Sequence, residues 1–300
     1  MPMAACPVRD SIQEISRDLW LVGNRLILSR TSASDSTWED GGGKGFLISP
    51  APQPLPLTRP LSDAGDIQLI HDAGDVSAVF RIGNEAFCKV RILDIANLTR
   101  EHTTLTWLHA RPWSFNLPRV LYHHEYNDRY FIFLSKAPGM TLDSLWPGLG
   151  ESERELYAEK VVDVCKELKS VTGTTISGVD GQALSERYLC GRGLDCSPEN
   201  LLKSCQELDM DCSRLVFYHC DLGPTNIIID RESGGLSIID WETAGFVPEE
   251  WIRTKFRISS GVDLSSGDEV DWRRRVGFRL GKQGYHDVTK AFSERTKRQE

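Results

Sequence analysis

Between Ile67 and Leu134, short apolar runs alternate with polar turn residues, a pattern typical of β-strands. Residues 76–82 (VSAVFRI) and 86–92 (AFCKVRI) are two such runs, and the Gly-Asn-Glu triplet between them suits a turn, which predicts a β-hairpin. Residues 98–109 space their apolar side chains as an amphipathic helix does. Two further strand candidates follow, at residues 120–122 and 130–134. The predicted order is a strand pair, a helix and a second strand pair.

After Pro138-Gly139 the apolar residues change to a helical spacing. The stretch 151–172 predicts an amphipathic helix, because several apolar residues fall on or near one face: Leu156, Val161, Val162, Val164, Cys165 and Leu168. Further helices are predicted at residues 198–208, 272–280 and 286–298. We therefore expect a mostly helical part from residue 138 to residue 300.

The first 65 residues carry a weaker pattern. A short helix and a strand are expected between Ser11 and Leu28. Residues 30–44 are rich in Ser, Thr, Asp and Gly, and residues 50–60 hold five prolines. Such stretches bury little apolar surface, which predicts loop or linker. The sequence thus predicts three parts: an N-terminal extension or linker at 1–65, a strand-rich lobe at 66–137 and a helical lobe at 138–300.

Composition and charge narrow the class of protein. The 300 residues are 40% hydrophobic and 26% charged, as in soluble globular enzymes, and the net charge of −8 is unlike that of a nucleic-acid binder. The basic run 273–275 has acidic neighbours, which favours a solvated helix face over a nucleic-acid or membrane site. No apolar run approaches the ~18–20 residues of a membrane span, and no signal-peptide pattern opens the chain. We therefore expect a cytoplasmic protein without a nucleic-acid or membrane partner.

The eight cysteines include no Cys-x-x-Cys pair, so a zinc site is not expected. Because no secretion signal is recognised, we expect the thiols to be reduced. Cys220 lies inside the motif described next, and we interpret it as a small space-filling residue.

The run 218–226 (YHCDLGPTN) carries the candidate chemistry. Asp221 and Asn226 are five residues apart, the spacing of the catalytic loop of kinase-type enzymes. There the aspartate accepts the proton of the substrate hydroxyl and the asparagine binds magnesium. Asp240 follows a strand-like run and fits a second metal ligand. A hairpin predicted over residues 227–239 would bring Asn226 at its entry beside Asp240 at its exit, which gives a hard cation two oxygen ligands. Alone, each piece fits a turn or a strand end; together they predict phosphoryl transfer.

This segment resembles the aminoglycoside phosphotransferase family of the protein-kinase-like fold, in particular its fungal branch of small phosphotransferase-domain proteins. The run 239–251 (IDWETAGFVPEEW) carries the resemblance together with the catalytic loop. The strong match covers about residues 215–260, and a weaker one extends upstream to about residue 70. The resemblance implies an α+β fold of two lobes, a small antiparallel-sheet N-lobe with one main helix and a mostly helical C-lobe.

The resemblance also implies a lysine that binds the α- and β-phosphates and a glutamate that orients it. Lys89, in the apolar run 86–92, is the candidate lysine, although a strand lysine ordinarily faces solvent. Glu101, in the predicted helix, is its candidate partner, with Asp94 as the alternative.

The nucleotide would contact two further stretches. The loop 71–77, with one glycine, takes the place of the phosphate-covering loop, and Ser77 is its candidate contact. Backbone groups of Ser135 and Ala137, in the expected hinge, would bind the purine edge, and Leu142 or Ile239 would form the floor under the ring. We assign His219 a structural role, in hydrogen bonds to backbone near the metal aspartate, in preference to that of a general base.

Departures from the protein-kinase pattern concern the acceptor. Gly223 replaces the lysine found two positions after the catalytic aspartate, Asp240-Trp241-Glu242 replaces Asp-Phe-Gly, and no Ala-Pro-Glu segment follows. The platform for a peptide is therefore missing, which favours a small molecule. The acceptor pocket is expected from the helical segment after residue 140 and from residues 245–262, and Glu242 is either a further carboxylate at the metal or a substrate contact.

The sequence therefore predicts a phosphotransferase that moves the γ-phosphoryl group of ATP, or alternatively GTP, to a hydroxyl group of a small molecule with the help of Mg²⁺. The alternatives are a catalytically weak nucleotide-binding pseudokinase or scaffold, and a protein kinase. The acceptor and the oligomeric state are left open.

Overall fold

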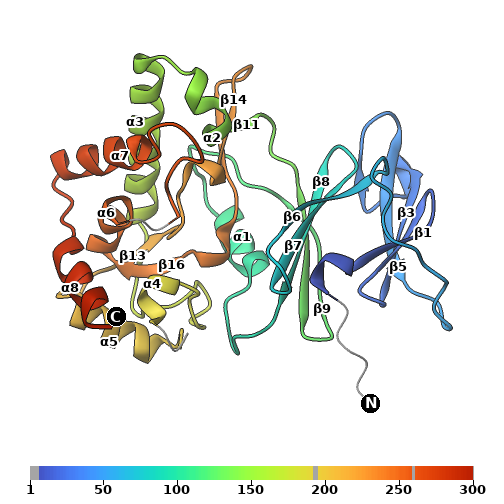
Figure 1. The fold of residues 1–300 in the computed structure, drawn as a ribbon, viewed down its shortest axis with the longest axis horizontal. Coiled ribbons are helices and arrows are strands. Elements are labelled where there is room, and N and C mark those ends of the chain that lie inside the picture. Colours follow the sequence, from blue (N-terminus) through green and yellow to red (C-terminus); the bar gives the residue numbers. More distant parts are fainter. Residues whose placement is uncertain (1–6, 192–194, 259–260, 300) are drawn as a thin grey trace. The chain divides into compact units, whose positions relative to one another are not determined.

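Ten strands of the N-terminal part form two five-stranded antiparallel sheets in the computed structural model, which describes residues 7–191, 195–258 and 261–299 (Figure 1). The described chain divides into two units. The first comprises residues up to 94 together with 118–136, and the second comprises 95–117 together with 137 onward. No helix in the described ranges is long and apolar enough to cross a membrane.

One sheet of the first unit corresponds to the predicted strand-rich lobe. Its strand order is β6-β7-β8-β10-β9. The predicted hairpin is confirmed, because β7 pairs with β8 from Ser77↔Arg91 to Ile82↔Ala86. Alternate residues of these strands are buried, as expected for a sheet with one covered face. The strands are β6 (Ile67–Asp72), β7 (Ser77–Ile82), β8 (Ala86–Ile92), β9 (Val120–Tyr126) and β10 (Arg129–Ser135).

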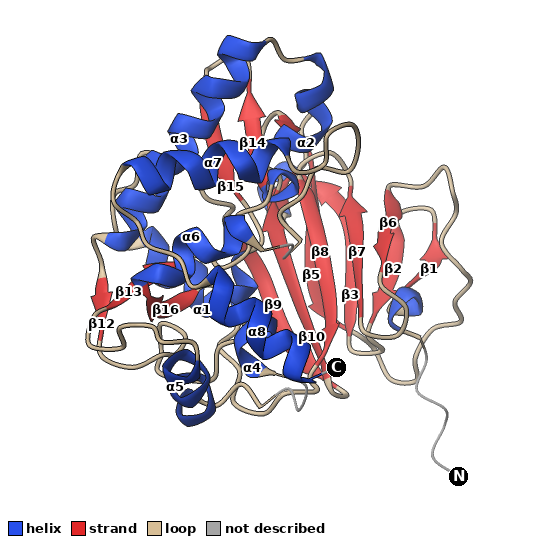
Figure 2. Cartoon of the chain, turned by 60° about the vertical axis from the view of Figure 1, so that its left-hand side comes forward, coloured by secondary structure: helices blue, strands red, loops and turns tan. Residues whose placement is uncertain are grey.

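The second sheet comes from residues for which the sequence predicts mainly loop or linker. Strands from residues 12–50 pair in the order β1-β2-β3-β5-β4 (strands in red, Figure 2), so the assignment of this range to an extension or linker is wrong. The short helix expected between Ser11 and Leu28 is also wrong, because strands occupy that stretch, whereas the loop expected at 30–44 is interrupted by the end of β3, by β4 and by the start of β5. Trp20, Phe46 and Trp38 are buried in a core that also contains Phe80 and Phe133 of the other sheet. Stacking the two sheets thus buries the apolar faces of both. The strands are β1 (Ile12–Ser16), β2 (Leu19–Val22), β3 (Leu26–Ser32), β4 (Trp38–Glu39) and β5 (Lys44–Pro50).

A buried aspartate links the two sheets. Asp40 is 3% exposed and forms an ion pair with Arg30 at 2.7 Å. Its Oδ1 accepts hydrogen bonds from the backbone N–H groups of Asn84 (2.7 Å) and Glu85 (3.0 Å), in the turn between β7 and β8. The N-terminal sheet therefore holds the hairpin that carries Lys89.

The second unit is mainly helical, as predicted. The helices expected at 151–172, 198–208, 272–280 and 286–298 are present as α3, α5, α7 and α8, whereas α6 was not predicted. The bounds are α1 (Glu101–His109), α2 (Leu142–Leu145), α3 (Glu151–Lys169), α4 (Arg187–Cys190), α5 (Pro198–Glu207), α6 (Glu249–Arg257), α7 (Asp271–Lys282) and α8 (Thr289–Gln299). The main helix expected in the N-lobe, α1, belongs to this unit by its contacts.

Two small antiparallel sheets complete the second unit and frame the candidate site. One joins β11 (Met140–Thr141), β14 (Ile227–Asp230) and β15 (Gly235–Ile238). The other joins β12 (Thr172–Gly173), β13 (Leu215–Tyr218) and β16 (Gly245–Pro248). The motif of Asp221 and Asn226 occupies the connection from β13 to β14.

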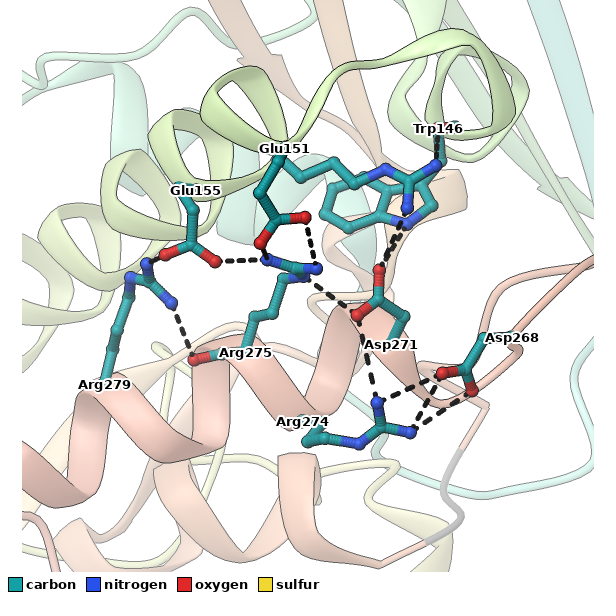
Figure 3. A network of polar contacts seen from close by, with 9 residues as sticks. Trp146, Glu151, Glu155, Asp268, Asp271, Arg274, Arg275 and Arg279 are labelled. Atoms are coloured by element: carbon teal, nitrogen blue, oxygen red, sulfur yellow. Dashed lines mark hydrogen bonds and ion pairs between the residues drawn. The ribbon is translucent and has the colours of Figure 1, made fainter.

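An ionic network connects α3 with α7 (Figure 3). Arg275 is 16% exposed and pairs with Glu151 at 2.6 Å and with Asp271 at 2.9 Å. Arg273 is 20% exposed and pairs with Asp263, whereas the more exposed Arg274 pairs with Asp268. The prediction of a solvated face is therefore wrong for two of the three arginines, which stabilise contacts within the unit.

The expectation of reduced thiols is wrong for one pair of cysteines. Cys190 and Cys196 form a disulfide with a Cα–Cα distance of 4.8 Å. Cys88, Cys165 and Cys220 are buried free thiols, and burial raises the pKa of each. Cys220 therefore has the properties expected of a space-filling residue.

Candidate active site

The catalytic loop begins where a buried strand ends. All four residues of β13 are buried, and Tyr218 pairs with Gly245 at the end of the ladder to β16. Cys220 then adopts a left-handed conformation (φ 64°), which turns the chain so that the next residue leaves the strand direction. The loop closes with hydrogen bonds from Gly223 N–H to Asp221 O (2.9 Å) and from Asn226 N–H to Gly223 O (3.0 Å).

Asp221 and Asn226 are in direct contact. The amide Nδ2 of Asn226 donates to the backbone oxygen of Asp221 (2.8 Å) and to its carboxylate Oδ2 (3.1 Å). The five-residue spacing thus has a geometric reason, since it lets one amide hold both the loop and the carboxylate. Both bonds use the amide nitrogen, so the oxygen Oδ1 remains as a possible ligand.

The environment of Asp221 suits a proton acceptor. Burial raises the pKa of Asp221 to about 6; the positive charge of Lys255 opposes this rise, and the negative charges of Asp240 and Glu186 add to it. A carboxyl group with a pKa near 6 is ionised at neutral pH and still basic enough to accept a proton in a transition state. The geometry and charge of the loop therefore fit general-base chemistry.

His219 has the structural role that the sequence predicts. It is fully buried, its Nδ1 accepts the backbone N–H of Asp221 (3.2 Å), and its Nε2 lies 2.9 Å from Ile239 O. Because Nδ1 is an acceptor, the ring proton is on Nε2, which donates to Ile239. The imidazole therefore ties the catalytic loop to the residue before Asp240 and is committed to both bonds.

The predicted hairpin is confirmed. Strand β14 pairs with β15 from Ile227↔Ile238 to Asp230↔Gly235, and the N–H of Ile239 donates to Asn226 O at 3.0 Å. This bond places Asp240 directly after the residue that faces Asn226. Asp240 itself is left-handed (φ 66°) and leads into a 3-10 turn at Trp241–Thr243.

Three carboxylates gather at this turn. One oxygen each from Glu101, Asp240 and Glu242 lies within 4.8 Å of the others. The buried Glu101, first residue of α1, accepts the backbone N–H of Trp241 at 3.0 Å with its Oε1. Carboxylates so close together repel one another unless a cation or protons compensate them.

The turn is held by an aromatic stack. Trp241 is fully buried, with its ring 6.0 Å from Phe115, 6.3 Å from Phe217 and 4.6 Å from His219. Its indole Nε1 donates to Ile238 O at 2.9 Å. The tryptophan of the Asp-Trp-Glu triplet therefore acts as the anchor that fixes the two carboxylates on either side of it.

The candidate phosphate ligands belong to the first unit. Lys89 is at the centre of β8, opposite Val79 of β7 and Ile132 of β10. Its neighbours Cys88 and Val90 are buried in the core, so Lys89 is on the other face of the strand. Ser77 is the first residue of β7. A contact between Lys89 and Glu101 stays a prediction.

In two other stretches expected to contact the nucleotide, a backbone N–H group already donates a hydrogen bond within the first unit. In the loop before β7, the N–H of Gly74 donates to Asp72 Oδ1 (2.9 Å). The N–H of Ser135, at the end of β10, donates to Arg119 O (2.9 Å), so its amide is engaged within the first unit. Ala137 begins the second segment of the second unit and is half-buried. The purine contacts of Ser135 and Ala137 stay predictions.

Sequence reasoning missed two charged residues near Asp221, Glu186 and Lys255. Both are 2% exposed and pair with each other at 3.2 Å. The available signal was the position of Lys255 four residues after Trp251 in the run 249–257, where a helical pattern would place it on the apolar face.

Comparisons with known proteins agree with this geometry. A family model described as "Phosphotransferase enzyme family" matches residues 66–248, more than half of the chain. An aminoglycoside phosphotransferase, APH(3'')-Id from Streptomyces rimosus, has a similar structure, with a TM-score of 0.50 and 20% identity over 77% of this chain and 92% of that one. An aminoglycoside-3'-phosphotransferase of type VIII also reaches 0.50, with 16% identity over 76% and 91% of the two chains. No curated protein sequence matches. The protein-kinase-like α+β fold is thereby confirmed, and the chain belongs to the phosphotransferase enzyme family.

Proposed function

We propose that this protein transfers the γ-phosphoryl group of ATP, or of GTP, to a hydroxyl group of a small molecule. The observation that carries the proposal is the pair of hydrogen bonds from Asn226 Nδ2 to Asp221, next to the hairpin that ends at Asp240. A proton acceptor and two oxygen ligands for a cation thus lie in one loop and on either side of the hairpin that follows it. Phosphoryl transfer needs this combination of positioning and charge neutralisation.

The proposed reaction moves one phosphoryl group and one proton. The acceptor oxygen forms a bond to the γ-phosphorus, and the bond from that phosphorus to the β,γ-bridging oxygen breaks and leaves ADP or GDP. The hydroxyl proton passes to the carboxylate of Asp221, which later releases it to water. The raised pKa of Asp221, about 6, supports this role because the group is ionised before the reaction at neutral pH.

The donor set supports magnesium. Mg²⁺ prefers oxygen ligands from one or two carboxylates together with substrate phosphates. Asn226 Oδ1 and the Asp240 carboxylate would hold it, with the nearby oxygens of Glu242 and Glu101 as further negative charge. When bound, Mg²⁺ neutralises the charge of the phosphates. The crowding of three carboxylates within 4.8 Å is the feature of this chain that supports a resident cation.

On the nucleotide side, we propose that Lys89 binds the α- and β-phosphates and that Glu101 orients it. The position of Lys89 on the central strand β8 supports this assignment, because its neighbours fix the strand in the core. Ser77 and the loop before it would contact phosphate oxygens, and backbone groups of Ser135 and Ala137 would contact the base.

A small acceptor is supported by the chain that follows Asp240. Residues 245–248 form β16 and residues 249–257 form α6, and most of both are buried. The segment that lays out a peptide in protein kinases is therefore replaced by packed secondary structure. One similar structure, APH(3'')-Id from Streptomyces rimosus, is a complex with ADP and streptomycin, which makes a polyhydroxylated amine a reasonable first acceptor to screen.

The test is thermal stability against nucleotide and magnesium, followed by turnover. A ligand at 100 times its dissociation constant adds about 2.7 kcal/mol to native stability. We expect a magnesium-dependent rise of the unfolding midpoint with ATP or GTP that Asp240→Ala abolishes. Asp221→Ala should keep the rise and lose turnover by orders of magnitude. No rise with either nucleotide in folded wild-type protein would contradict the proposal.

A further inference from the structure

A chain of hydrogen bonds within the first unit leads from the N-terminal sheet to the expected hinge. Asp40, which follows β4, is 3% exposed, and its Oδ1 accepts the backbone N–H groups of Asn84 (2.7 Å) and Glu85 (3.0 Å). Glu85 O in turn accepts the backbone N–H of Lys136 at 2.8 Å. A single residue, Glu85, therefore connects a buried carboxylate to the backbone of the hinge.

Lys136 is the residue between the two proposed contacts of the base, Ser135 and Ala137. The ladder between β8 and β10 ends at Ser135↔Ala86, so the bond from the Lys136 N–H extends this ladder by one residue. The N–H of Ser135 is held by Arg119 O at 2.9 Å. These two bonds fix the backbone at the end of β10, where the purine edge is expected to bind.

The turn between β7 and β8 depends on Asp40 for its shape. Gly83 in this turn is left-handed (φ 58°), and it is so close to the carboxylate that a Cβ there would lie 2.4 Å from both carboxylate oxygens. Asn84 and Glu85 then present two adjacent N–H groups to one oxygen. Both residues are exposed, so a turn that lost this oxygen would be free to move its amides toward water.

Asp40 is itself held in place by the N-terminal sheet. Its Oδ2 pairs with Arg30 at 2.7 Å, and Arg30 Nε pairs with Asp66 Oδ2 at 2.7 Å. The guanidinium carbon also lies 4.1 Å from the centroid of the Phe46 ring. Because the N–H of Gly83 donates to Asp66 O at 2.7 Å, both carboxylate partners of the arginine contact the same turn.

We propose that Asp40 is a positioning residue for the nucleotide. It fixes the turn at Glu85, and Glu85 fixes Lys136, so that the backbone groups of the hinge are in place to bind the purine edge. The inference rests on the proposed function and extends it to the N-terminal sheet, which is outside the strand-rich lobe that the sequence predicts. A residue of this sheet thereby sets nucleotide affinity without touching the nucleotide.

Four variants of the full chain separate this role from a purely structural one. Asp40→Ala removes the acceptor of both amides and a partner of Arg30. Gly83→Ala acts on the same contact from the turn, since its methyl group would displace the carboxylate. Asp40→Asn loses the ion pair but keeps an oxygen for the two amides. Glu14→Ala is the matched control: Glu14 is 6% exposed, lies in the N-terminal sheet and pairs at 2.6 Å with Arg59, which is not part of the turn.

The readouts are the unfolding midpoint and the Kd of magnesium-ATP or magnesium-GTP, whichever wild type binds more tightly, by isothermal titration calorimetry. All four variants should have a lower midpoint than wild type, because each disturbs a buried carboxylate and its arginine partner. We expect Asp40→Ala and Gly83→Ala to raise the Kd roughly 3- to 10-fold, the effect of one weakened hydrogen bond to the base. Asp40→Asn and Glu14→Ala should keep the Kd within about twofold of wild type.

An unchanged Kd in folded Asp40→Ala or Gly83→Ala, or a Kd that rises as much in Asp40→Asn or Glu14→Ala, would overturn the inference and leave the proposed function intact. Failure of the wild type to bind either nucleotide would instead overturn the proposed function, and this inference with it.

Discussion

The raised pKa of Asp221 makes a prediction about stability that needs no knowledge of the acceptor. A native pKa of about 6 against an ordinary value of 3.8 corresponds to about 3 kcal/mol, at roughly 1.4 kcal/mol per pKa unit. The native state binds this proton more tightly than the unfolded state does. Stability of the wild type is therefore lost as the pH rises from about 4 to about 6, and the full cost is present above pH 6.

Asp221→Asn removes this cost. The amide keeps an oxygen that can accept the Asn226 Nδ2 hydrogen bond, and it cannot ionise. Above pH 7 the variant should be more stable than wild type by up to about 3 kcal/mol, an upper bound because the side chain is partly exposed. Near pH 4 the two proteins should be equally stable. Asp221, the proposed proton acceptor, is thus expected to be a residue whose side chain lowers the stability of the folded protein.

The assay is urea unfolding followed by tryptophan fluorescence, between pH 4 and pH 8, in EDTA and without nucleotide. Asp230→Asn, at the far end of the same hairpin, is the control. Its carboxyl accepts the Ser233 hydroxyl, which lowers its pKa, so the substitution should destabilise the protein at neutral pH. If Asp221→Asn were less stable than wild type by the same margin at pH 4 and at pH 8, Asp221 would have an ordinary pKa and the reasoning would be refuted.

Two further predictions follow from the same contacts. Turnover should rise with pH through about 6 and then level off, since Asp221 must be ionised to accept a proton; a pH profile of kcat/KM for magnesium-ATP checks this, and a rise centred near pH 4 would contradict it. Asp40→Ala should cost roughly 1–3 kcal/mol of unfolding free energy, because two backbone amides lose their acceptor and the half-buried Arg30 keeps only its second carboxylate partner, Asp66. Urea unfolding measures this cost, with the exposed Glu39→Ala as control, and a loss below about 0.5 kcal/mol would show that Asp40 does not link the sheets.

The features that sequence predicted well are those set by neighbours along the chain. The hairpin at residues 227–238 follows from two β-branched runs and a turn between them, and its pairing is local. The contact of Asp221 with Asn226 spans five residues and is closed within one loop. Periodicity over 19 residues was likewise enough for α3. In each case the physics that decides the structure acts within a short window.

The N-terminal sheet shows where prediction from a short stretch of sequence fails. Residues 26–32 and 44–50 pair as β3 and β5, but the stretch between them holds Ser, Thr, Asp and three consecutive glycines, a composition typical of loops. Residues 26–32 and 44–50 become strands because they pair with each other and because their apolar side chains pack against the other sheet. Asp40 could not be assigned either, because its burial depends on turn residues Asn84 and Glu85, 44 and 45 positions away.

In the candidate site, too, the residues set by local spacing were predicted and those set by distant contacts were not. Asp221, Asn226 and Asp240 could be proposed because the chemistry of phosphoryl transfer requires these residue types at a fixed local spacing. Glu101 was expected to orient a lysine, which stays a prediction, but its hydrogen bond from the Trp241 amide, 140 residues away, was not foreseen. Lys255 and Glu186 are separated by 69 residues, and no pattern in the sequence pairs them. A motif therefore indicates which groups to propose for the reaction, while the groups that hold them in place depend on tertiary contacts that any one segment leaves undetermined.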